Sequence, residues 1–423
     1  MTLVWRLLIV VGLLVAGAGV ETSAFAATHK PAATTSKPKP SKPAKPPAAP
    51  ATPIEVVIPQ LLVDMATGNV LYSDNAGVPW HPASLTKLMT AYVAFEAIEQ
   101  GRVTLDTKVT MSDKATHQEP GISGLPTGDT LSLKDALYIM LVKSANDMAV
   151  AIAETVDGST DAFVAEMNAT ASRLGMSRTH YDNVNGLPDD GQITTARDLA
   201  VLAIDLRRTF PQYDPIFRTH NVTIGKTNLR TNNELLTRFA GTTGMKTGYV
   251  CGSGLNVVAT VTRNNRDLLA VVLGGSSARE RDQLAAQMLL KGFSGGYTDS
   301  GSSVVNIADD MTSPVKDMKP MLCGKLAKQY VSQRMKDFPA GFKGYDNYLT
   351  DKVPSVTYAA QDFGRPADQP IPTTSSDEGP SEGDGSDESP SAPTAPTQPG
   401  VITQPAPAVP AVAPAATPGN AGK

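Results

Sequence analysis

Residues 82–100 of the chain are PASLTKLMTAYVAFEAIEQ. Apolar side chains recur at helical spacing after Ser84, which predicts a helix from there to about Gln100. Lys87 follows Ser84 by three positions, so both side chains should lie on one face of that helix. A serine hydroxyl needs a neighbouring base to become a nucleophile. A lysine can be that base where burial or a second cation lowers its pKa.

Two further motifs follow in order, Ser144-Ala145-Asn146 and Lys246-Thr247-Gly248. The first supplies a second hydroxyl with an amide, and the second supplies a cation beside a hydroxyl. Lys246 is the cation that could lower the pKa of Lys87. Free N–H groups at the helix start near Ser84 favour a developing oxyanion. Such a set can cleave an acyl bond without a histidine or a metal.

Each motif is weak by itself. Ser36-x-x-Lys39 and Ser313-x-x-Lys316 also match the first pattern, and Ser73-Asp74-Asn75 matches the second. These matches fall in segments that look like a linker, an appendage and a hairpin, so we interpret them as chance. The ordered set is different, because its members open a helix, follow a helix and open a run of strands.

Residues 54–298 predict a mixed α/β domain, with an antiparallel sheet covered by a helical cluster. Strands are expected at both ends of it, as a hairpin turning at Thr67-Gly68-Asn69 and as apolar runs on either side of Asn264-Asn265. Helices are expected between them. Capping pairs mark three helix starts: Ser132 with Asp135, Thr195 with Asp198, and Ser277 with Glu280.

The ends of the chain differ in composition from this domain. Residues 1–26 are typical of a secretory signal with an Ala24-Phe25-Ala26 cleavage site, and an uncleaved membrane anchor is the alternative. Residues 27–53 form a Pro/Lys-rich linker, 299–360 a small appendage and 361–423 a disordered, Pro/Ser/Ala-rich acidic tail. The basic linker could attract anionic envelope polymer, but we prefer to interpret it as a solvated tether.

Composition excludes several other functions. The chain has 423 residues and a net charge of −4, without the basic excess that nucleic-acid binding requires. None of its five histidines shows zinc spacing, and His81, close to Ser84, is interpreted as a packing or hydrogen-bonding residue. The sequence has no Gly-x-Ser-x-Gly elbow, no phosphate loop and no cofactor motif, so neither a metal nor a cofactor is expected.

Cys251 and Cys323 are the only cysteines. In an exported chain, two cysteines predict one disulfide. Because Cys251 lies three residues after Gly248, that bond would strap the appendage to the rim of the site. Two buried free thiols are the alternative.

The chain resembles the low-molecular-mass penicillin-binding proteins, specifically the D-alanyl-D-alanine carboxypeptidases with a β-lactamase/transpeptidase-like fold. The similarity runs from about Ile58 to Phe293. Beyond the three motifs, it includes Asn185-Gly186-Leu187 and the segments 194–200, 244–256 and 274–281. That breadth makes the resemblance specific.

The resemblance implies a catalytic role for five residues. Ser84 would attack the carbonyl of the penultimate D-alanine and become acylated. Lys87 would accept the serine proton and later help to activate water. Ser144 and Asn146 would relay a proton to the leaving amine and hold the peptide amide, while Lys246 tunes the electrostatics.

It also implies a substrate-binding set of Thr247, Gly248, Tyr249 and Arg281. Thr247 and Arg281 would bind the terminal carboxylate, with Arg279 as the alternative arginine. The N–H groups of Ser84 and Tyr249 would form the oxyanion hole. The Tyr249 side chain could shape substrate choice.

The implied activity is removal of the terminal D-alanine from peptidoglycan stem peptides, in the periplasm or envelope of a bacterium, with β-lactams as covalent inhibitors. A D,D-endopeptidase that cleaves cross-links is the nearest alternative. A class A β-lactamase needs a water-aiming glutamate, and the chain has none between Glu166 and Glu234. A non-catalytic wall-binding module would leave the motifs unexplained.

The family's usual C-terminal features are not recognised in the chain. Members commonly carry a β-rich domain and then an amphipathic anchoring helix. Residues 299–360 look too short and irregular for such a domain, and the end of the chain is Pro/Ala-rich. Membrane anchoring by the C-terminus is therefore not expected.

Overall fold

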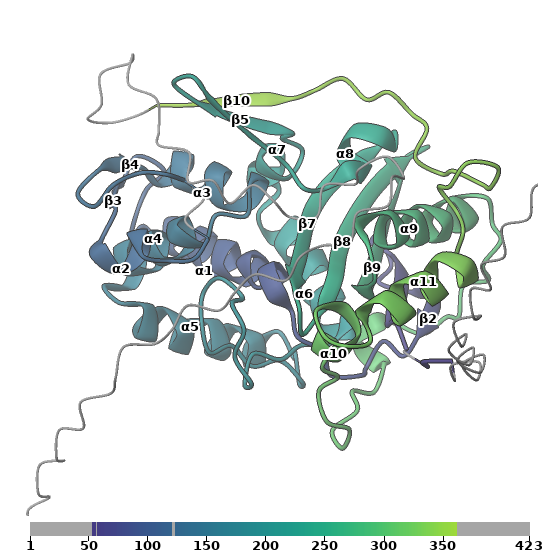
Figure 1. The fold of residues 1–423 in the computed structure, drawn as a ribbon. Coiled ribbons are helices and arrows are strands. Elements are labelled where there is room, and N and C mark those ends of the chain that lie inside the picture. The colour runs from purple at the N-terminus through teal and green to yellow at the C-terminus, as the bar shows by residue number, and fades with distance from the viewer. Residues whose placement is uncertain (1–52, 56, 121–122, 362–423) are drawn as a thin grey trace, which may run out of the picture. The chain divides into compact units, whose positions relative to one another are not determined.

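A computed structural model describes residues 53–55, 57–120 and 123–361 (Figure 1). The expected signal at 1–26, the linker before Pro53 and the tail after Gln361 lie outside these residues. The described chain from Ile54 onward belongs to one unit. No helix in this described part is long and apolar enough to cross a membrane.

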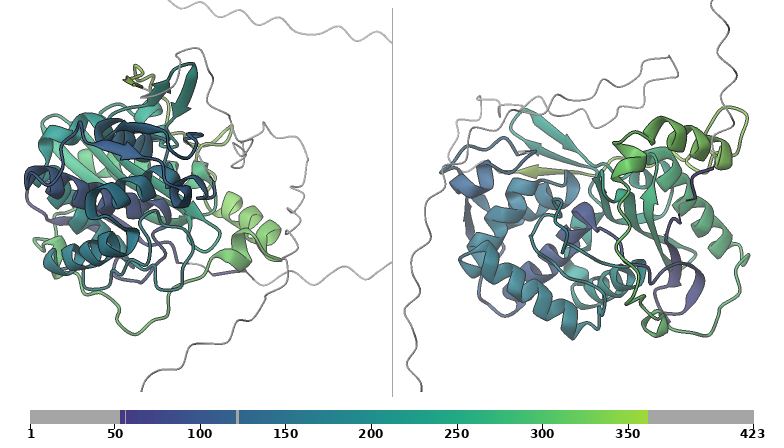
Figure 2. Two further views of the ribbon diagram at one scale, coloured as in Figure 1. Left: turned by 90° about the vertical axis from the view of Figure 1, so that its left-hand side faces the viewer. Right: turned by 60° about the horizontal axis from the view of Figure 1, so that its bottom comes forward.

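The unit contains both strands and helices (Figures 1 and 2). The strands are β1 Gln60–Asp64, β2 Val70–Asp74, β3 Lys108–Thr110, β4 Thr130–Ser132, β5 Asn221–Ile224, β6 Thr227–Arg230, β7 Thr242–Val250, β8 Gly254–Arg263, β9 Arg266–Gly275 and β10 Thr357–Ala360. The α-helices are α1 Lys87–Glu99, α2 Asp113–Thr116, α3 Leu133–Val142, α4 Asn146–Asp157, α5 Thr160–Arg173, α6 Ala196–Thr209, α7 Asp214–Phe217, α8 Glu234–Arg238, α9 Ala278–Phe293, α10 Lys319–Leu322 and α11 Ala327–Asp337. The 3-10 turns are η1 Ala83–Thr86, η2 Pro211–Tyr213 and η3 Val304–Asn306.

The main sheet has five strands in the order β2-β1-β9-β8-β7, and every neighbouring pair is antiparallel. This confirms the predicted antiparallel sheet. Asn264 and Asn265 join β8 to β9 and both have positive φ, 50° and 61°. Two positive φ values suit the tight hairpin turns whose twist matches that of the flanking strands, and asparagine tolerates them.

Helices cover both faces of the sheet (Figure 1). Successive side chains of a strand point to opposite faces, so each strand contributes to a core on either side. In β9, Leu269 and Val271 join the core that includes α1, α3, α4 and α6. Their neighbours Leu268 and Ala270 join a second core with α9. The sheet thus holds a helical cluster on one side and a single long helix on the other.

The three predicted helix caps are confirmed. The Ser132, Thr195 and Ser277 hydroxyls accept hydrogen bonds from backbone N–H groups three residues later, at 3.0, 3.0 and 3.1 Å. Each bond satisfies one N–H that the first helical turn leaves without a partner.

Three features differ from the expectations. The first turn of the predicted helix at Ser84 is the 3-10 turn η1, and α1 begins at Lys87. Short strands lie among the helices, β3 with β4 and β5 with β6. Residues 357–360 form β10, which joins the sheet of β5 and β6 and runs parallel to β5. These strands have only three or four residues, too few for a periodic pattern to show.

Residues 299–360 run back across the unit. Val304, Met318 and Tyr330 are buried in the same core as the helical cluster. Asp309 accepts a hydrogen bond of 2.9 Å from Thr195 Oγ1 at the start of α6. This return segment, as we call residues 299–360, is therefore packed onto the elements that precede it.

Candidate active site

Ser84 lies in η1, which leads directly into α1. The preceding residue, Ala83, has a left-handed φ of 49°, which costs free energy for a residue with a side chain. Gly186 packs against this turn, and a Cβ there would lie only 1.9 Å from the Ala83 carbonyl oxygen. The surrounding structure thus holds the turn before Ser84 in a strained conformation, as is common at functional sites.

Lys87 is completely buried in the first turn of α1. Its Nζ lies 2.9 Å from Ser84 Oγ, and it donates to Asn146 Oδ1 and to the Asn185 carbonyl oxygen, both at 2.7 Å. These two oxygens can only accept. A neutral amine has two hydrogens and one lone pair, so the oxygens take the hydrogens and the lone pair faces the serine hydroxyl. Neutral Lys87 is therefore oriented to receive the Ser84 proton.

The surroundings favour the neutral amine. Burial lowers the pKa of Lys87 well below its usual value, the charge of Lys246 lowers it further, and Asp147 opposes the shift. Burial and then the charge of Arg281 lower the pKa of Lys246 to about 7. The site thus contains two amines with depressed pKa values, as general-base chemistry near neutral pH requires.

Ser144 and Lys246 form the second half of the site. Lys246 Nζ donates to Ser144 Oγ and to the Thr247 carbonyl oxygen, both at 2.8 Å. Ser144 lies in the tight connection between α3 and α4, with a left-handed φ of 71°. The sharp bend brings its hydroxyl to β7, 102 positions further along the chain.

Asn146 begins α4 and bridges two parts of the site. Its Oδ1 accepts from Lys87, and its Nδ2 donates to the Glu119 carbonyl oxygen at 3.1 Å. Asn185 Nδ2 donates to Gln118 Oε1 at 2.9 Å. The segment around residues 118–119 therefore lies over the start of α4 and close to Lys87.

Strand β7 forms the opposite wall. It lies at an end of the five-stranded sheet, where β8 is its only strand partner among the described residues. Gly248 packs on η1, and a Cβ there would lie 3.0 Å from the backbone nitrogen of Ser84. Thr247 is buried, and its hydroxyl makes no hydrogen bond to any residue that the structure describes. The wall thus offers a hydroxyl and a strand edge to a ligand.

Tyr249 stands at the rim of this wall, with 43% of its surface exposed. Cys251 and Cys323 are joined in a disulfide with their Cα atoms 5.8 Å apart, as the cysteine count predicts. The Tyr249 hydroxyl lies 3.4 Å from Cys323 Sγ and 3.8 Å from Cys251 Sγ. The disulfide therefore supports the tyrosine at the edge of the site.

Arg281 and Arg279 diverge from the start of α9. Arg281 is buried close enough to Lys246 to lower its pKa, and it forms two hydrogen bonds to Asp282, at 2.7 and 2.8 Å. It also donates to the Asn232 carbonyl oxygen, but its Nη1 has no hydrogen bond to a described residue. Arg279 donates to carbonyl oxygens of the return segment and lies over the Phe342 ring. Of the two arginines, Arg281 is the one whose charge reaches the site.

The structure therefore brings the predicted residues together. It also adds two groups that the motifs did not identify as parts of the site. The Asn185 backbone carbonyl helps to orient Lys87, and the buried Asp147 carboxylate opposes its pKa shift. A carbonyl group leaves no sequence signature, although Asn185 belongs to a stretch that resembles the family. Asp147 directly follows Asn146, which was the available signal.

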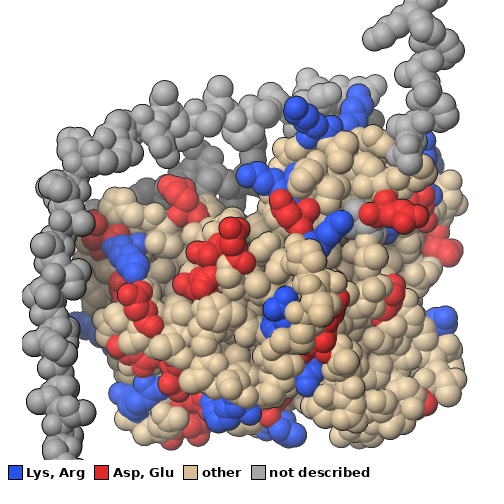
Figure 3. Space-filling view, turned by 90° about the horizontal axis from the view of Figure 1, so that it is seen from below, with Lys and Arg blue, Asp and Glu red and all other residues tan. Residues whose placement is uncertain are grey.

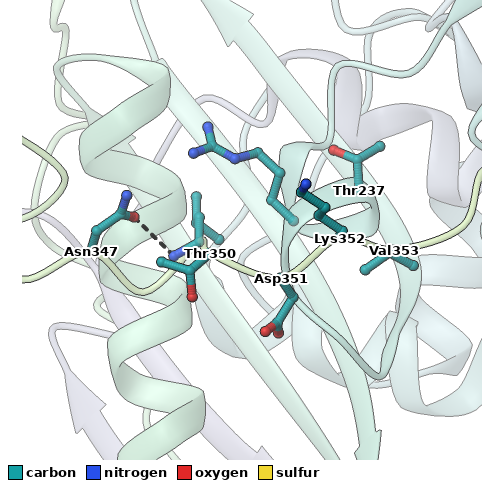
Figure 4. A pocket seen from close by; sticks show the side chains of 8 residues that line it. Thr237, Asn347, Thr350, Asp351, Lys352 and Val353 are labelled. Carbon is teal, nitrogen blue, oxygen red and sulfur yellow. Dashed lines mark hydrogen bonds between the residues drawn. The ribbon is translucent and has the colours of Figure 1, made fainter.

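Other candidates do not join this site. His81 Nδ1 is 3.0 Å from the Gln192 carbonyl oxygen, which agrees with a hydrogen-bonding role. No cluster of three or more potential metal ligands occurs within the described residues. A pocket of about 530 Å³ shown in Figure 4 contains none of the predicted site residues. Its lining is Thr237, Arg238, Asn347, Leu349, Thr350, Asp351, Lys352 and Val353.

Known proteins match more than half of the chain. D-alanyl-D-alanine carboxypeptidase DacC of Escherichia coli (strain K12) is 35% identical over 240 residues, which cover 55% of this chain and 60% of DacC. DacF of Bacillus subtilis (strain 168), also named a D-alanyl-D-alanine carboxypeptidase, is 32% identical over 240 residues, covering 55% and 61%. The aligned region thus spans about 60% of the length of these curated relatives.

Solved structures agree with the fold. Penicillin-binding protein 6B from Escherichia coli is 34% identical with a TM-score of 0.54, covering 58% of this chain and 80% of that one. Penicillin-binding protein D2 from Listeria monocytogenes, in the cefotaxime-bound form, is 29% identical with a TM-score of 0.52, covering 57% and 100%. The predicted transpeptidase-like fold is thereby confirmed. Residues 55–277, more than half of the chain, match the D-alanyl-D-alanine carboxypeptidase family, to which this chain therefore belongs.

Proposed function

We propose that the chain is a serine-type D-alanyl-D-alanine carboxypeptidase, which removes the terminal D-alanine from peptidoglycan stem peptides through an acyl-enzyme. The observation that carries this proposal is the 2.9 Å approach of Lys87 Nζ to Ser84 Oγ, with the amine's two other partners both acceptors. Such an amine activates a hydroxyl that is otherwise a poor nucleophile.

The reaction begins when Ser84 Oγ attacks the carbonyl carbon of the penultimate D-alanine and its proton passes to Lys87 Nζ. The N–H groups of Ser84 and Tyr249 hold the oxyanion, and each such donor lowers the barrier by roughly 3–4 kcal/mol. Ser144 then gives a proton to the leaving amine of the terminal D-alanine. The proton that Lys87 received is passed through Lys246 back to Ser144, so Lys87 is again a free amine. The peptide bond breaks and an ester to Ser84 remains.

Water completes the cycle. Lys87 Nζ takes a proton from the water that attacks the ester carbonyl, and gives that proton to Ser84 Oγ as the ester bond breaks. Asn146 holds the peptide amide of the substrate. The products are free D-alanine and a stem peptide shortened by one residue.

The terminal carboxylate is recognised at the end of the cleft. Thr247 offers an unused hydroxyl, Arg281 offers Nη1, and Lys246 supplies charge. A guanidinium suits a free carboxylate, so the site should prefer chain ends to internal bonds. Gly248 lets β7 pack close to η1, and Tyr249 borders the substrate at the rim.

β-Lactams are the expected covalent inhibitors, since they present a strained amide to the same serine. The cefotaxime-bound form of the similar penicillin-binding protein D2 supports this assignment. A D,D-endopeptidase remains the alternative, because it would use the same residues in a cleft of different shape.

The proposal includes export and domain organisation. The substrate lies in the cell wall, so we infer that residues 1–26 direct the chain to the periplasm or envelope. Residues 54–298 are proposed as the catalytic domain and 299–360 as its appendage. We propose no cofactor and no nucleic-acid partner.

The test uses the purified chain with a pentapeptide ending in D-Ala-D-Ala and with a cross-linked dimer. We expect D-alanine release from the pentapeptide, and Ser84→Ala should abolish it. Ser313→Ala is the matched control, because Ser313-x-x-Lys316 has the same spacing and should retain full activity. Mass spectrometry should locate a penicilloyl adduct on Ser84. Dimer cleavage with no D-alanine release would favour the endopeptidase, and full activity in Ser84→Ala would exclude the mechanism.

A further inference from the structure

The return segment carries a row of exposed lysines, which we call the lysine strip. Its members are Lys316, Lys319, Lys325, Lys328, Lys336 and Lys343. None of them forms an ion pair with any described residue. Lysines elsewhere, such as Lys108 and Lys226, form no ion pair with a described residue either, so the distinctive feature of the strip is its excess of one sign of charge: residues 316–343 hold these six lysines and Arg334 but only two acids.

Two acids, Asp317 and Asp337, lie among these lysines in the sequence. Asp317 accepts a hydrogen bond from the backbone N–H of Lys319 at 2.8 Å. Asp337 lies 4.0 Å from Arg334, and Arg334 is itself paired with the buried Glu280. The strip is therefore strongly positive, although the whole chain has a net charge of −4.

The strip begins at the rim of the candidate active site. Cys323, which is bonded to Cys251, lies between Lys319 and Lys325 in the sequence. The Met318 N–H also donates to the Gly252 carbonyl oxygen at 2.8 Å. On the face seen from below, several basic side chains lie at the top and upper right, with acidic side chains next to them (Figure 3). The helices α10 and α11 appear on this side in the right-hand view of Figure 2.

Distances show which ligand could feel this charge. Cys251 is three residues after Gly248, a chain reach of about 10 Å, and the disulfide adds 5.8 Å between Cα atoms. Physiological salt screens exposed charges over about 8 Å. Lys319 and Lys325 can therefore act on the part of a ligand that projects out of the cleft. Lys336 lies beyond most of the roughly 16 Å length of α11, so it can act only on a ligand that extends further along the surface.

We propose that the lysine strip binds the polymeric substrate, by attracting carboxylates of neighbouring stem peptides on the glycan strand whose stem occupies the cleft. This inference rests on the proposed function. Each stem ends in a carboxylate, so a strand is a repeating anion and a single peptide is not. Charge of one sign next to a cleft raises association rates with an oppositely charged substrate.

The experiment compares two substrates of one reaction, soluble glycan strands bearing pentapeptide stems and the isolated pentapeptide. The test variant replaces Lys316, Lys319, Lys325 and Lys328 by glutamine in the full chain. The control replaces Lys108 and Lys226, which are also exposed but lie in β3 and in the β5–β6 turn. We expect kcat/KM on strands to fall about tenfold in the test variant, at the lower end of electrostatic steering effects, with the pentapeptide unaffected.

Salt provides a second measure. Raising ionic strength should lower kcat/KM on strands in the unsubstituted chain and in the control, and much less in the test variant. An unchanged strand rate in the test variant, or an equal fall in the control, would overturn the inference. Pentapeptide turnover by the unsubstituted chain tests the proposed function separately.

Two other occupants give different results. Residues 377–388 hold six acids and no base, so the chain's own tail could neutralise the strip. In that case, a chain ending at Gln361 would act on strands several times faster, and this gain would be lost in the test variant. Co-sedimentation of the chain with phosphatidylglycerol vesicles but not with strands would indicate a lipid surface. Either outcome overturns the assignment to the substrate strand.

Discussion

Lys87 has no carboxylate within hydrogen-bonding distance among the described residues, although it is completely buried. Its partners are a hydroxyl, an amide oxygen and a backbone carbonyl, none of which carries the countercharge that a buried ammonium requires. Asp147 acts on it only through space. The site therefore stabilises a free amine, and the neighbouring Lys246 charge makes protonation of that amine still less favourable.

The charge of Lys246 should therefore be visible in the pH dependence of acylation. In Lys246→Gln the pKa of Lys87 rises, so less free amine is present at a given pH and the acidic limb of the profile moves to higher pH. The shift should be partial, because burial is the larger cause. The measurement is the rate constant for acylation by a chromogenic cephalosporin at a series of pH values.

Lys246→Arg is the matched control, since arginine keeps a positive charge at that position at all accessible pH values. Its acidic limb should stay at or below that of the unsubstituted chain, even if the maximal rate falls. The comparison thus separates a change in the pH of the acidic limb from a change in the maximal acylation rate. A limb that does not move in Lys246→Gln would show that the two amines are not coupled.

The turn that contains Gly186 packs against η1 and holds it in place. Gly186 has φ of 87° and touches the Ala83 carbonyl, so an added Cβ must displace η1. Gly175 has a similar φ of 71° but nothing within 4 Å of its Cβ position. Gly175→Ala should therefore cost only the left-handed conformation, about 1–2 kcal/mol of folding free energy.

Gly186→Ala should cost more stability and should also slow acylation. Displacing a nucleophile by about 1 Å can reduce a rate a hundredfold, and we expect at least about a tenfold loss. Thermal unfolding and cephalosporin acylation would be measured on both variants. If Gly186→Ala acylates as fast as Gly175→Ala, this turn does not position Ser84.

The elements differ in how far the sequence predicts them, for a physical reason. The caps at Ser132, Thr195 and Ser277 use bonds to N–H groups three residues away, so the pattern is local and visible. Strand β10 pairs with β5, which is 136 positions earlier in the chain, and its four residues carry no periodic signal of their own. Whether so short a segment forms a strand depends on its pairing with residues distant in the sequence.

The same distinction applies to the candidate site. The three motifs predict its side chains, because their chemistry depends on residue type. The Asn185 carbonyl, the left-handed Ser144 and the packing of Gly186 depend on the backbone path, and the motifs say little about that path. Only the resemblance to the family points to Arg281, and no motif predicts its hydrogen bonds to Asp282.

The return segment connects parts of the described chain that are distant in the sequence. It contacts the start of α6 through Asp309, the end of β7 through the disulfide, α9 through Arg334, and β5 through β10. The return segment thus ties the helical cluster and the sheet together around the site. Loss of one tie should weaken the molecule without unfolding it.

The disulfide is the tie that can be removed most cleanly. It closes a loop with a sequence separation of 72, which the chain-entropy model values at roughly 4 kcal/mol. Cys251→Ser combined with Cys323→Ser should therefore unfold several degrees lower in a thermal scan. Reduction of the unsubstituted chain should lower its Tm by a similar amount, whereas the double variant should not respond to reductant. Because Tyr249 lies against both sulfur atoms, the double variant should also raise KM for the pentapeptide more than it lowers kcat. An unchanged Tm in both experiments would mean that the hydrogen bonds and buried side chains of the return segment hold it without the covalent bond.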